Sequence, residues 1–284
     1  MGRFRLRGRR RRRGGQERAD RIPVRAIVPN LVTSMAACAG ITSISLSSEG
    51  RFVHALVALL VACVCDGMDG RIARLLKASS KLGAELDSLA DFVNFGVAPA
   101  MFMFYWLTGG PEHAGMSPQM VRLVLGCALF YALCDCFRLA RFNTMLEQPS
   151  EPYWKHFFTG VPAPGGCWMV LTPAVLSIAL EAKGKYPALA DALQNPYFGM
   201  FALLFIGALM ASRLPTISLK SLHISRRYQL PVMAGLLFVV ALLISNFWMT
   251  VGVMGFLYLL TVPVTGLVFL RVRARALDAD AAKV

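Results

Sequence analysis

The sequence predicts an all-α integral membrane protein with about eight transmembrane helices, and three observations support this fold class. First, 56% of the 284 residues are hydrophobic and only 16% are charged, whereas soluble domains carry about 25% charged residues. Second, the apolar runs are long and continuous, which favours spanning helices over a β-barrel. Third, the basic residues, which give a net charge of +14, are concentrated in a few segments. These features exclude an ordinary soluble domain.

The chain begins with a strongly basic segment. Residues 1–25 hold eleven of the thirty Lys and Arg residues, including the run from Arg9 to Arg13. The segment lacks the apolar core of a secretory signal. An Arg-rich head could bind RNA or anionic lipid. We instead expect a disordered cytoplasmic tail that helps to orient the first helix, and we expect no nucleic-acid partner.

The first four predicted helices are separated by short polar connections. The first follows Arg25 and begins with the sequence PNLVT, which places a proline near the helix start. The second begins with an apolar sequence and ends in an acidic motif. The third carries two aspartates before a long apolar run. A Gly/Pro loop at 108–118 precedes the fourth. The expected ranges are 26–47, 52–75, 81–107 and 119–142.

The second half of the chain is predicted to add four more helices. A polar, Pro-containing connection at 144–164 precedes them, a polar loop at 182–195 follows the first, and a basic loop precedes the last pair. The expected ranges are 165–181, 196–212, 228–244 and 247–270. We therefore expect one membrane domain over residues 26–275, followed by a short cytoplasmic tail at 276–284.

The distribution of basic residues predicts the orientation in the membrane. An even number of helices places both termini on one side. On that side lie all but four of the thirty Lys and Arg residues, the exceptions being Arg51, Arg122, Lys183 and Lys185. Because cytoplasmic loops carry an excess of Lys and Arg, both termini are expected in the cytoplasm. The expected location is the inner (cytoplasmic) membrane, with the active site at the cytoplasmic face.

The acidic stretch at 66–91 is the strongest functional signal. Asp66 and Asp69 share one face of a predicted helix, and Asp87 and Asp91, four residues apart, share a face of the next. Two antiparallel helices joined by a short polar turn could aim all four carboxylates into one cleft. Such a cluster repels itself unless cations fill it. Carboxylate oxygens suit Mg²⁺ or Mn²⁺, and two ions are the usual arrangement for phosphoryl-type displacement.

The residues around these acids favour a phosphate ligand over a structural role. Ionisable groups at membrane depth are costly and mark functional sites by default. Gly70 and Gly83 remove side chains where a bulky group has to approach the helices. Arg74 offers a planar fork that suits a phosphate.

The motif D-x2-D-G-x2-A-R-x8-G-x3-D-x3-D resembles the signature of the CDP-alcohol phosphatidyltransferase family. The chain matches every fixed position: Asp66, Asp69, Gly70, Ala73, Arg74, Gly83, Asp87 and Asp91. Further stretches resemble the phosphatidylserine synthase branch, the CDP-diacylglycerol–serine O-phosphatidyltransferases. They are PNLVT (29–33), DSLADFVNFGVAPA (87–100), RLARFN (138–143) and FTGVPAP (158–164).

The resemblance implies a reaction and a set of site residues. The phosphatidyl group of CDP-diacylglycerol would pass to the hydroxyl of L-serine, giving phosphatidylserine and CMP, with Asp91 as general base. Two divalent cations, Mg²⁺ or Mn²⁺, would be held by Asp66, Asp69, Asp87 and Asp91. CDP-diacylglycerol would be bound by Asn30, Thr33, Gly70, Ala73, Arg74 and Gly83.

The sequence indicates less about the acceptor pocket and the partners. Arg138 and Arg141 with Asn143 are candidates for the serine carboxylate, although arginines at a helix C-terminus also satisfy carbonyls and lipid phosphates. The resemblance implies a homodimer in contact with membrane lipid. The same chemistry on glycerol 3-phosphate, inositol phosphate or choline stays open. A membrane metal-ion transporter is the alternative from another class, but transporters favour inverted repeats and broken helices.

Overall fold

The computed structural model describes residues 27–78, 80–109, 116–145, 157–184, 186–212, 215–217, 228–262 and 265. The two predicted tails, 1–25 and 276–284, lie outside the described residues. So do most of the basic loop before residue 228 and the predicted end of the last helix, 266–270.

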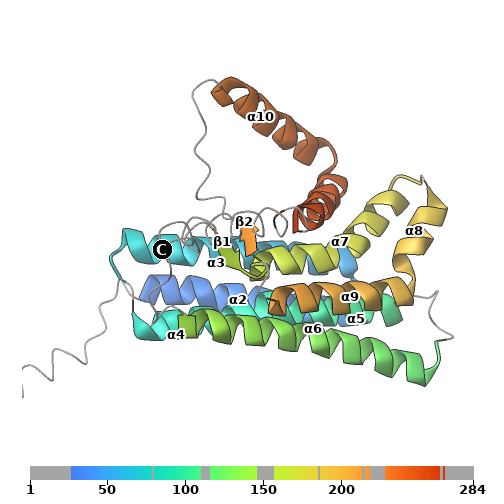
Figure 1. Cartoon of the computed structure of the whole chain (residues 1–284), viewed down its shortest axis with the longest axis horizontal. Coiled ribbons are helices and arrows are strands. Elements are labelled where there is room, and N and C mark those ends of the chain that lie inside the picture. The colour runs from blue at the N-terminus through green and yellow to red at the C-terminus, as the bar shows by residue number, and fades with distance from the viewer. Residues whose placement is uncertain are drawn as a thin grey trace, which may run out of the picture.

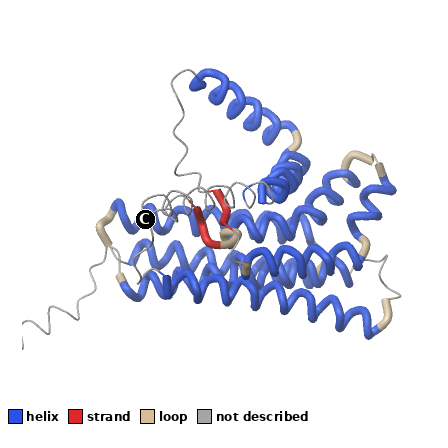
Figure 2. Tube along the Cα trace, in the orientation of Figure 1, coloured by secondary structure: helices blue, strands red, loops and turns tan. Residues whose placement is uncertain are grey.

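Helices dominate the described residues (Figure 1, Figure 2). In chain order they are α2 (Ile27–Ser48), α3 (Phe52–Leu75), α4 (Lys81–Asp91), the π-helical segment η2 (Phe92–Val97), α5 (Ala98–Thr108), α6 (Pro118–Met145), α7 (Ala163–Glu181), α8 (Pro187–Gln194), α9 (Pro196–Ala211), α10 (Gln229–Ser245) and a final helix, Phe247–Val262. The predicted all-helical fold class is confirmed, and the described residues add one short strand pair to it. Two three-residue strands, β1 (Phe157–Thr159) and β2 (Pro215–Ile217), pair antiparallel with Phe158 opposite Thr216.

The predicted number of eight spanning helices is not confirmed by the described residues. Among the described residues, α2, α3, α6 and α7 are long and apolar enough to cross a membrane. The pair α8 and α9 makes a fifth span if it is counted as one, with a 58° bend between its halves. The helix α10 and the final helix are apolar but shorter. These helices make the chain a multi-pass membrane protein.

The second half of the predicted loop at 182–195 is helical instead. Pro187 lies in the first turn of α8, where a backbone N–H would have no partner within the helix, so the missing N–H of proline costs no hydrogen bond. The Ala190 side chain is buried, and Gln194 donates a hydrogen bond to Ser177 of α7 at 2.9 Å. These contacts fold α8 back onto α7, so a segment polar enough to resemble a loop forms part of the bundle.

Of the four described helices that are long and apolar enough to cross a membrane, α7 is the most deeply buried. It is buried over most of its length, through Met169, Val170, Leu171 and Ala174 among others. The helices α2 and α3 each bury only a narrow stripe, and their remaining apolar side chains face outward. Outward apolar side chains are what a lipid environment requires.

Small residues let α2 pack closely against its neighbours. Its buried stripe contains Thr33, Ala36, Gly40, Ser43 and Ser47. Small residues are typical of helix contacts in membranes, because association there depends on close van der Waals packing. At Gly40 the space that a Cβ would occupy is taken by the Asn94 side chain of η2. The second half of α2 is thereby held against η2, the segment that follows Asp91.

The predicted third helix is one helical run with a π-helical segment in its middle. Pro99 has no N–H, so the Phe95 carbonyl four residues earlier lacks its usual donor. The Tyr131 hydroxyl of α6, which is fully buried, donates to that carbonyl at 3.0 Å. A π-helical turn at this point is typical of a helix whose regular ladder is interrupted. The contact fixes α6 against the segment that follows Asp91.

The helix α10 stands away from the bundle (Figure 1) and has no buried residue. It forms where a helix at 228–244 was predicted. Asn246 alone separates it from the final helix, as the sequence predicts for the last pair. Leu230, Leu236 and Phe238 are among its exposed apolar side chains. An apolar helix with no protein neighbour is suited to lipid.

We predict that Tyr131→Phe lowers the free energy of unfolding by about 1–2 kcal/mol, because it leaves a buried carbonyl without a donor. Thermal unfolding of the purified protein in detergent measures the effect. Tyr197→Phe, at a tyrosine that is 68% exposed, is the matched control. Pro99→Ala restores an N–H that can donate to the Phe95 carbonyl. Combined with Tyr131→Phe in a double variant, it should therefore recover part of the lost free energy of unfolding. Equal melting temperatures for Tyr131→Phe and the control would contradict the account.

Candidate metal centre

Two helices, α3 and α4, bring the acidic residues together. Asp66 and Asp69 lie on α3, and Asp87 and Asp91 lie on α4. The Ser80 hydroxyl caps α4 by accepting a hydrogen bond from the Gly83 N–H at 3.0 Å, which starts the helix directly after the turn. One carboxylate oxygen from each of Asp66, Asp69 and Asp87 lies within 4.8 Å of the other two.

The negative charges of these three carboxylates have few compensating partners among the described residues. Asp69 is 4% exposed and accepts a hydrogen bond from the buried Thr33 hydroxyl at 2.7 Å. The Oδ1 atom of Asp66 is buried without a hydrogen-bond partner among the described residues. The ion pairs within the described ranges, at Glu49 and Asp135, include none of the three. Two like charges at this separation repel by about 3 kcal/mol at an effective dielectric constant of ~20.

The donor set fits a divalent cation. Converging carboxylate oxygens, one of them buried and unpaired, are the ligands that hard cations such as Mg²⁺ and Mn²⁺ take. A cation there would replace the repulsion between Asp66, Asp69 and Asp87 with attraction.

Asp91 occupies a different place from the other three. It is the last residue of α4, one turn beyond Asp87, and it lies outside the three-carboxylate group. Its carboxyl group lies against that of Asp66 and is near enough to Arg138 of α6 for their charges to interact. It therefore stands between the group on α3 and the basic end of α6.

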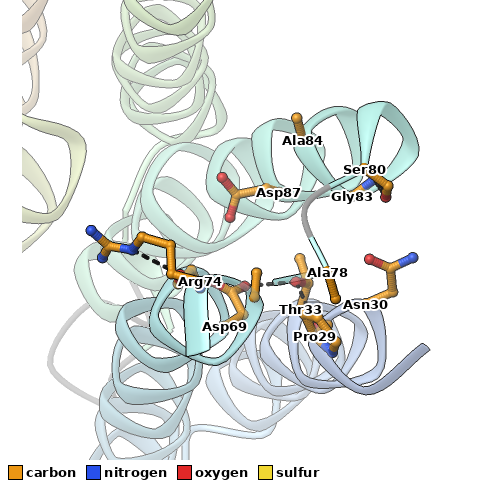
Figure 3. Close-up of a pocket in the computed structure, with 12 residues that line it drawn as sticks. Pro29, Asn30, Thr33, Asp69, Arg74, Ala78, Ser80, Gly83, Ala84 and Asp87 are labelled. Carbon is orange, nitrogen blue, oxygen red and sulfur yellow. Dashed lines mark hydrogen bonds between the residues drawn. The ribbon is translucent and has the colours of Figure 1, made fainter. Parts of the chain in front are cut away.

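A pocket of about 280 Å³ opens beside the acids (Figure 3). The picture shows Asp69 and Asp87 approaching it from neighbouring helices, with Arg74 at one end and Asn30 at the other. All six residues predicted to bind CDP-diacylglycerol contribute to its wall. The complete lining is Pro29, Asn30, Thr33, Asp69, Gly70, Ala73, Arg74, Ala78, Ser80, Gly83, Ala84 and Asp87.

The two glycines of the motif have different surroundings. A Cβ at Gly70 would meet no atom of the described residues within 4 Å, so their packing does not require glycine there. A Cβ at Gly83 would lie 2.9 Å from the Asn30 side-chain oxygen. Gly83 thus allows α2 to approach α4, whereas Gly70 leaves space open in the pocket. The Arg74 Nε donates to the Gly70 carbonyl at 3.1 Å, and the rest of its exposed side chain is directed outward.

The three candidate acceptor residues point in different directions. The Arg138 Nε donates to Asp135 at 3.3 Å and the Arg138 charge reaches Asp91. Arg141 donates to the last carbonyls of α9, at Ala211 and Ser212, over 3.0 and 2.9 Å. Asn143 donates to the Ser88 hydroxyl of α4 at 3.1 Å. The Arg138 charge thus reaches the motif.

Sequence reasoning missed several residues of the site. Pro29, Ala78 and Ala84 line the pocket without any chemical signal of their own. Ser80 could have been found, because a serine directly before the first residue of a predicted helix is typical of an N-cap. Asp135 is visible in the sequence as a single carboxylate in an apolar run, but its partners are not.

Known proteins are similar to this chain over the region that contains these residues. Residues 26–212 match the family model of CDP-alcohol phosphatidyltransferases. A CDP-diacylglycerol–serine O-phosphatidyltransferase of Mycobacterium leprae is 40% identical over 157 residues, which cover 55% of this chain and 49% of that protein. The proteins of the same name from Helicobacter pylori (strain J99) and Bacillus subtilis are 34% and 32% identical. Their matches cover 66% and 60% of this chain and 70% and 90% of those proteins.

The matched region contains every described residue of the metal centre and its pocket. The chain spans about half the length of the mycobacterial relatives that it matches. The family model nevertheless covers well over half of this chain, from before α2 to the end of α9. The chain belongs to the CDP-alcohol phosphatidyltransferase family.

Proposed function

We propose that the protein transfers the phosphatidyl group of CDP-diacylglycerol to the hydroxyl of L-serine, which gives phosphatidylserine and CMP. The observation that carries this proposal is the group of three carboxylates beside a pocket that the six candidate lipid-nucleotide residues line. The names of the relatives at 32–40% identity support serine as the acceptor.

In this proposal Asp66, Asp69, Asp87 and Asp91 hold two divalent cations, Mg²⁺ or Mn²⁺. Bound there, such cations supply charge neutralisation at the diphosphate and the leaving group. The buried hydrogen bond from Thr33 holds the Asp69 carboxylate in place. Preorganised ligands of this kind lower the reorganisation needed when substrate binds.

CDP-diacylglycerol binds in the pocket between α2, α3 and α4. Gly70 and Ala73 present little side chain on the face that the cytidine nucleotide would contact. Arg74 pairs with a phosphate, and Asn30 and Thr33 close the other side together with Gly83. These residues orient the diphosphate toward the carboxylates, and such positioning supplies a large part of the acceleration in phosphoryl transfer.

Asp91 takes the proton from the serine hydroxyl. As that O–H bond breaks, the serine oxygen forms a bond to the phosphorus that carries diacylglycerol, and the bond from that phosphorus to CMP breaks. Arg138, Arg141 and Asn143 are proposed for the acceptor site. Arg138 is the strongest of them, because its charge reaches Asp91 and a guanidinium matches a carboxylate.

The finer architecture is also proposed. About eight helices span the inner (cytoplasmic) membrane, both termini are cytoplasmic and the active site faces the cytoplasm. Residues 26–275 form the membrane domain between the basic tail 1–25 and the short tail 276–284. The enzyme acts as a homodimer surrounded by lipid. The exposed apolar surface of α10 supports burial of that helix in the bilayer.

We predict that Asp87→Asn lowers CMP release from CDP-diacylglycerol by about 100-fold or more, since it removes a charged ligand from the group. Radiolabelled CMP release in detergent micelles containing Mn²⁺ or Mg²⁺ measures it. Glu85→Gln, an exposed acid on the same helix, is the control and should stay within twofold of wild type. Undiminished turnover in Asp87→Asn would contradict the metal-site assignment.

A panel of alcohols tests the acceptor. Purified protein with CDP-diacylglycerol and Mn²⁺ or Mg²⁺ is expected to release CMP with L-serine at least about tenfold faster than with the other acceptors, because Arg138 favours a carboxylate. The others are glycerol 3-phosphate, inositol phosphate and choline. Release with glycerol 3-phosphate but not with serine would overturn the acceptor assignment and leave the metal site intact.

Alanine substitutions at the two motif glycines should separate an effect on ligand binding from an effect on helix packing. Gly70→Ala is expected to fold with equal or higher thermal stability, since alanine favours helix by about 1 kcal/mol and its Cβ meets no atom. Its KM for CDP-diacylglycerol should rise about tenfold, because the added methyl group intrudes on the nucleotide. Gly83→Ala should instead lower thermal stability, because its Cβ presses on Asn30. An unchanged KM in Gly70→Ala would remove Gly70 from the proposed binding surface.

A further inference from the structure

The helix α6 carries a buried ion pair that the proposed reaction does not use. Asp135 is fully buried, and its Oδ1 accepts a hydrogen bond from the Arg138 Nε at 3.3 Å. The Arg138 side chain is 12% exposed. Charges inside a membrane protein are costly and mark a function by default. A buried pair is often no more stable than apolar residues of the same volume, so stability alone is a weak reason for it.

The position of the Asp135 carboxylate is set by η2. Its second oxygen, Oδ2, is buried and has no hydrogen-bond partner in the described part of the chain. That oxygen packs against Gly96, where a Cβ would lie only 2.8 Å away. Glycine at 96 therefore makes room for Asp135. The carboxylate is confined between η2 and its own helix, with one oxygen directed to Arg138.

The pairing leaves the rest of the Arg138 guanidinium free for a ligand. Asp135 engages Nε, and within the described ranges the two terminal nitrogens make no hydrogen bond. The Arg138 charge also acts on Asp91, the proposed general base, which lies against Asp66. Arg138 thus interacts both with Asp135 and, through its charge, with Asp91.

We propose that Asp135 is a positioning residue that holds Arg138 by its Nε and so directs the two terminal nitrogens at the carboxylate of the acceptor. A guanidinium fork binds a carboxylate through two parallel hydrogen bonds. Bound in this way, the serine hydroxyl lies beside Asp91. Asp135 thereby sets the preference for an acceptor that carries a carboxylate. The inference rests on the proposed serine transfer and adds a residue to it.

The test compares steady-state constants of full-length variants in detergent micelles. Asp135→Asn keeps the shape of the side chain but loses its charge. Gly96→Ala keeps the charge but displaces the carboxylate. Each is expected to raise the KM for serine about tenfold, while kcat and the KM for CDP-diacylglycerol stay within about twofold. Because both substitutions act on one contact, the double variant should raise the KM for serine by less than the product of the two single increases.

Cys134→Ala is the matched control, because Cys134 is the buried neighbour of Asp135 and faces an apolar groove beside Ala208 of α9. Its KM for serine should stay within about twofold of wild type. If Asp135→Asn fails to fold, Gly96→Ala decides the question by itself. A purely structural role would change kcat and both KM values together, and that result would overturn the positioning role.

A wild-type enzyme that uses another alcohol and not serine would overturn the proposed function and this inference with it. A serine-dependent wild type in which neither Asp135→Asn nor Gly96→Ala alters the KM for serine would overturn this inference alone.

Discussion

The mutual repulsion of carboxylates at the junction of α2, α3 and α4 is the constraint on which the site depends. Asp66, Asp69 and Asp87 converge to within 4.8 Å, and the ion pairs of the described residues lie elsewhere. Among the described residues, Asp69 is the one of the three that accepts a hydrogen bond from a buried hydroxyl, that of Thr33. Such an arrangement is tolerable when cations bind, because attraction to a divalent ion outweighs repulsion between ligands. The fold therefore keeps a high-energy cluster in place for a ligand.

Close helix packing is what holds that cluster together. The helix α2 approaches α4 and η2 where glycines face amide side chains, Gly83 opposite Asn30 and Gly40 opposite Asn94. Larger residues at these glycines would separate the helices and widen the distance between Asp69 and Asp87. In a membrane such contacts depend on shape rather than on hydrophobic driving force. The small residues of α2 are therefore part of the site, although none of them has reactive chemistry.

The π-helical segment decides which elements face the acids from the other side. It begins directly after Asp91, and the missing N–H of Pro99 leaves the Phe95 carbonyl to the Tyr131 hydroxyl. That contact brings α6 against η2, with Asp135 one turn further along at Gly96. A local interruption of the backbone ladder thus connects the metal centre to the basic end of α6.

The sequence by itself determined the membrane character, the order and bounds of most helices, and the four aspartates with their helical faces. It could do so because hydropathy and residue spacing are local properties of the chain. Tertiary structure alone decided that Asp91 stands apart from the other three acids and that Arg141 reaches α9. It also decided that a polar segment folds into α8. These outcomes depend on contacts between residues far apart in the chain, such as Asp135 with Gly96, and no local pattern encodes which side chains will meet.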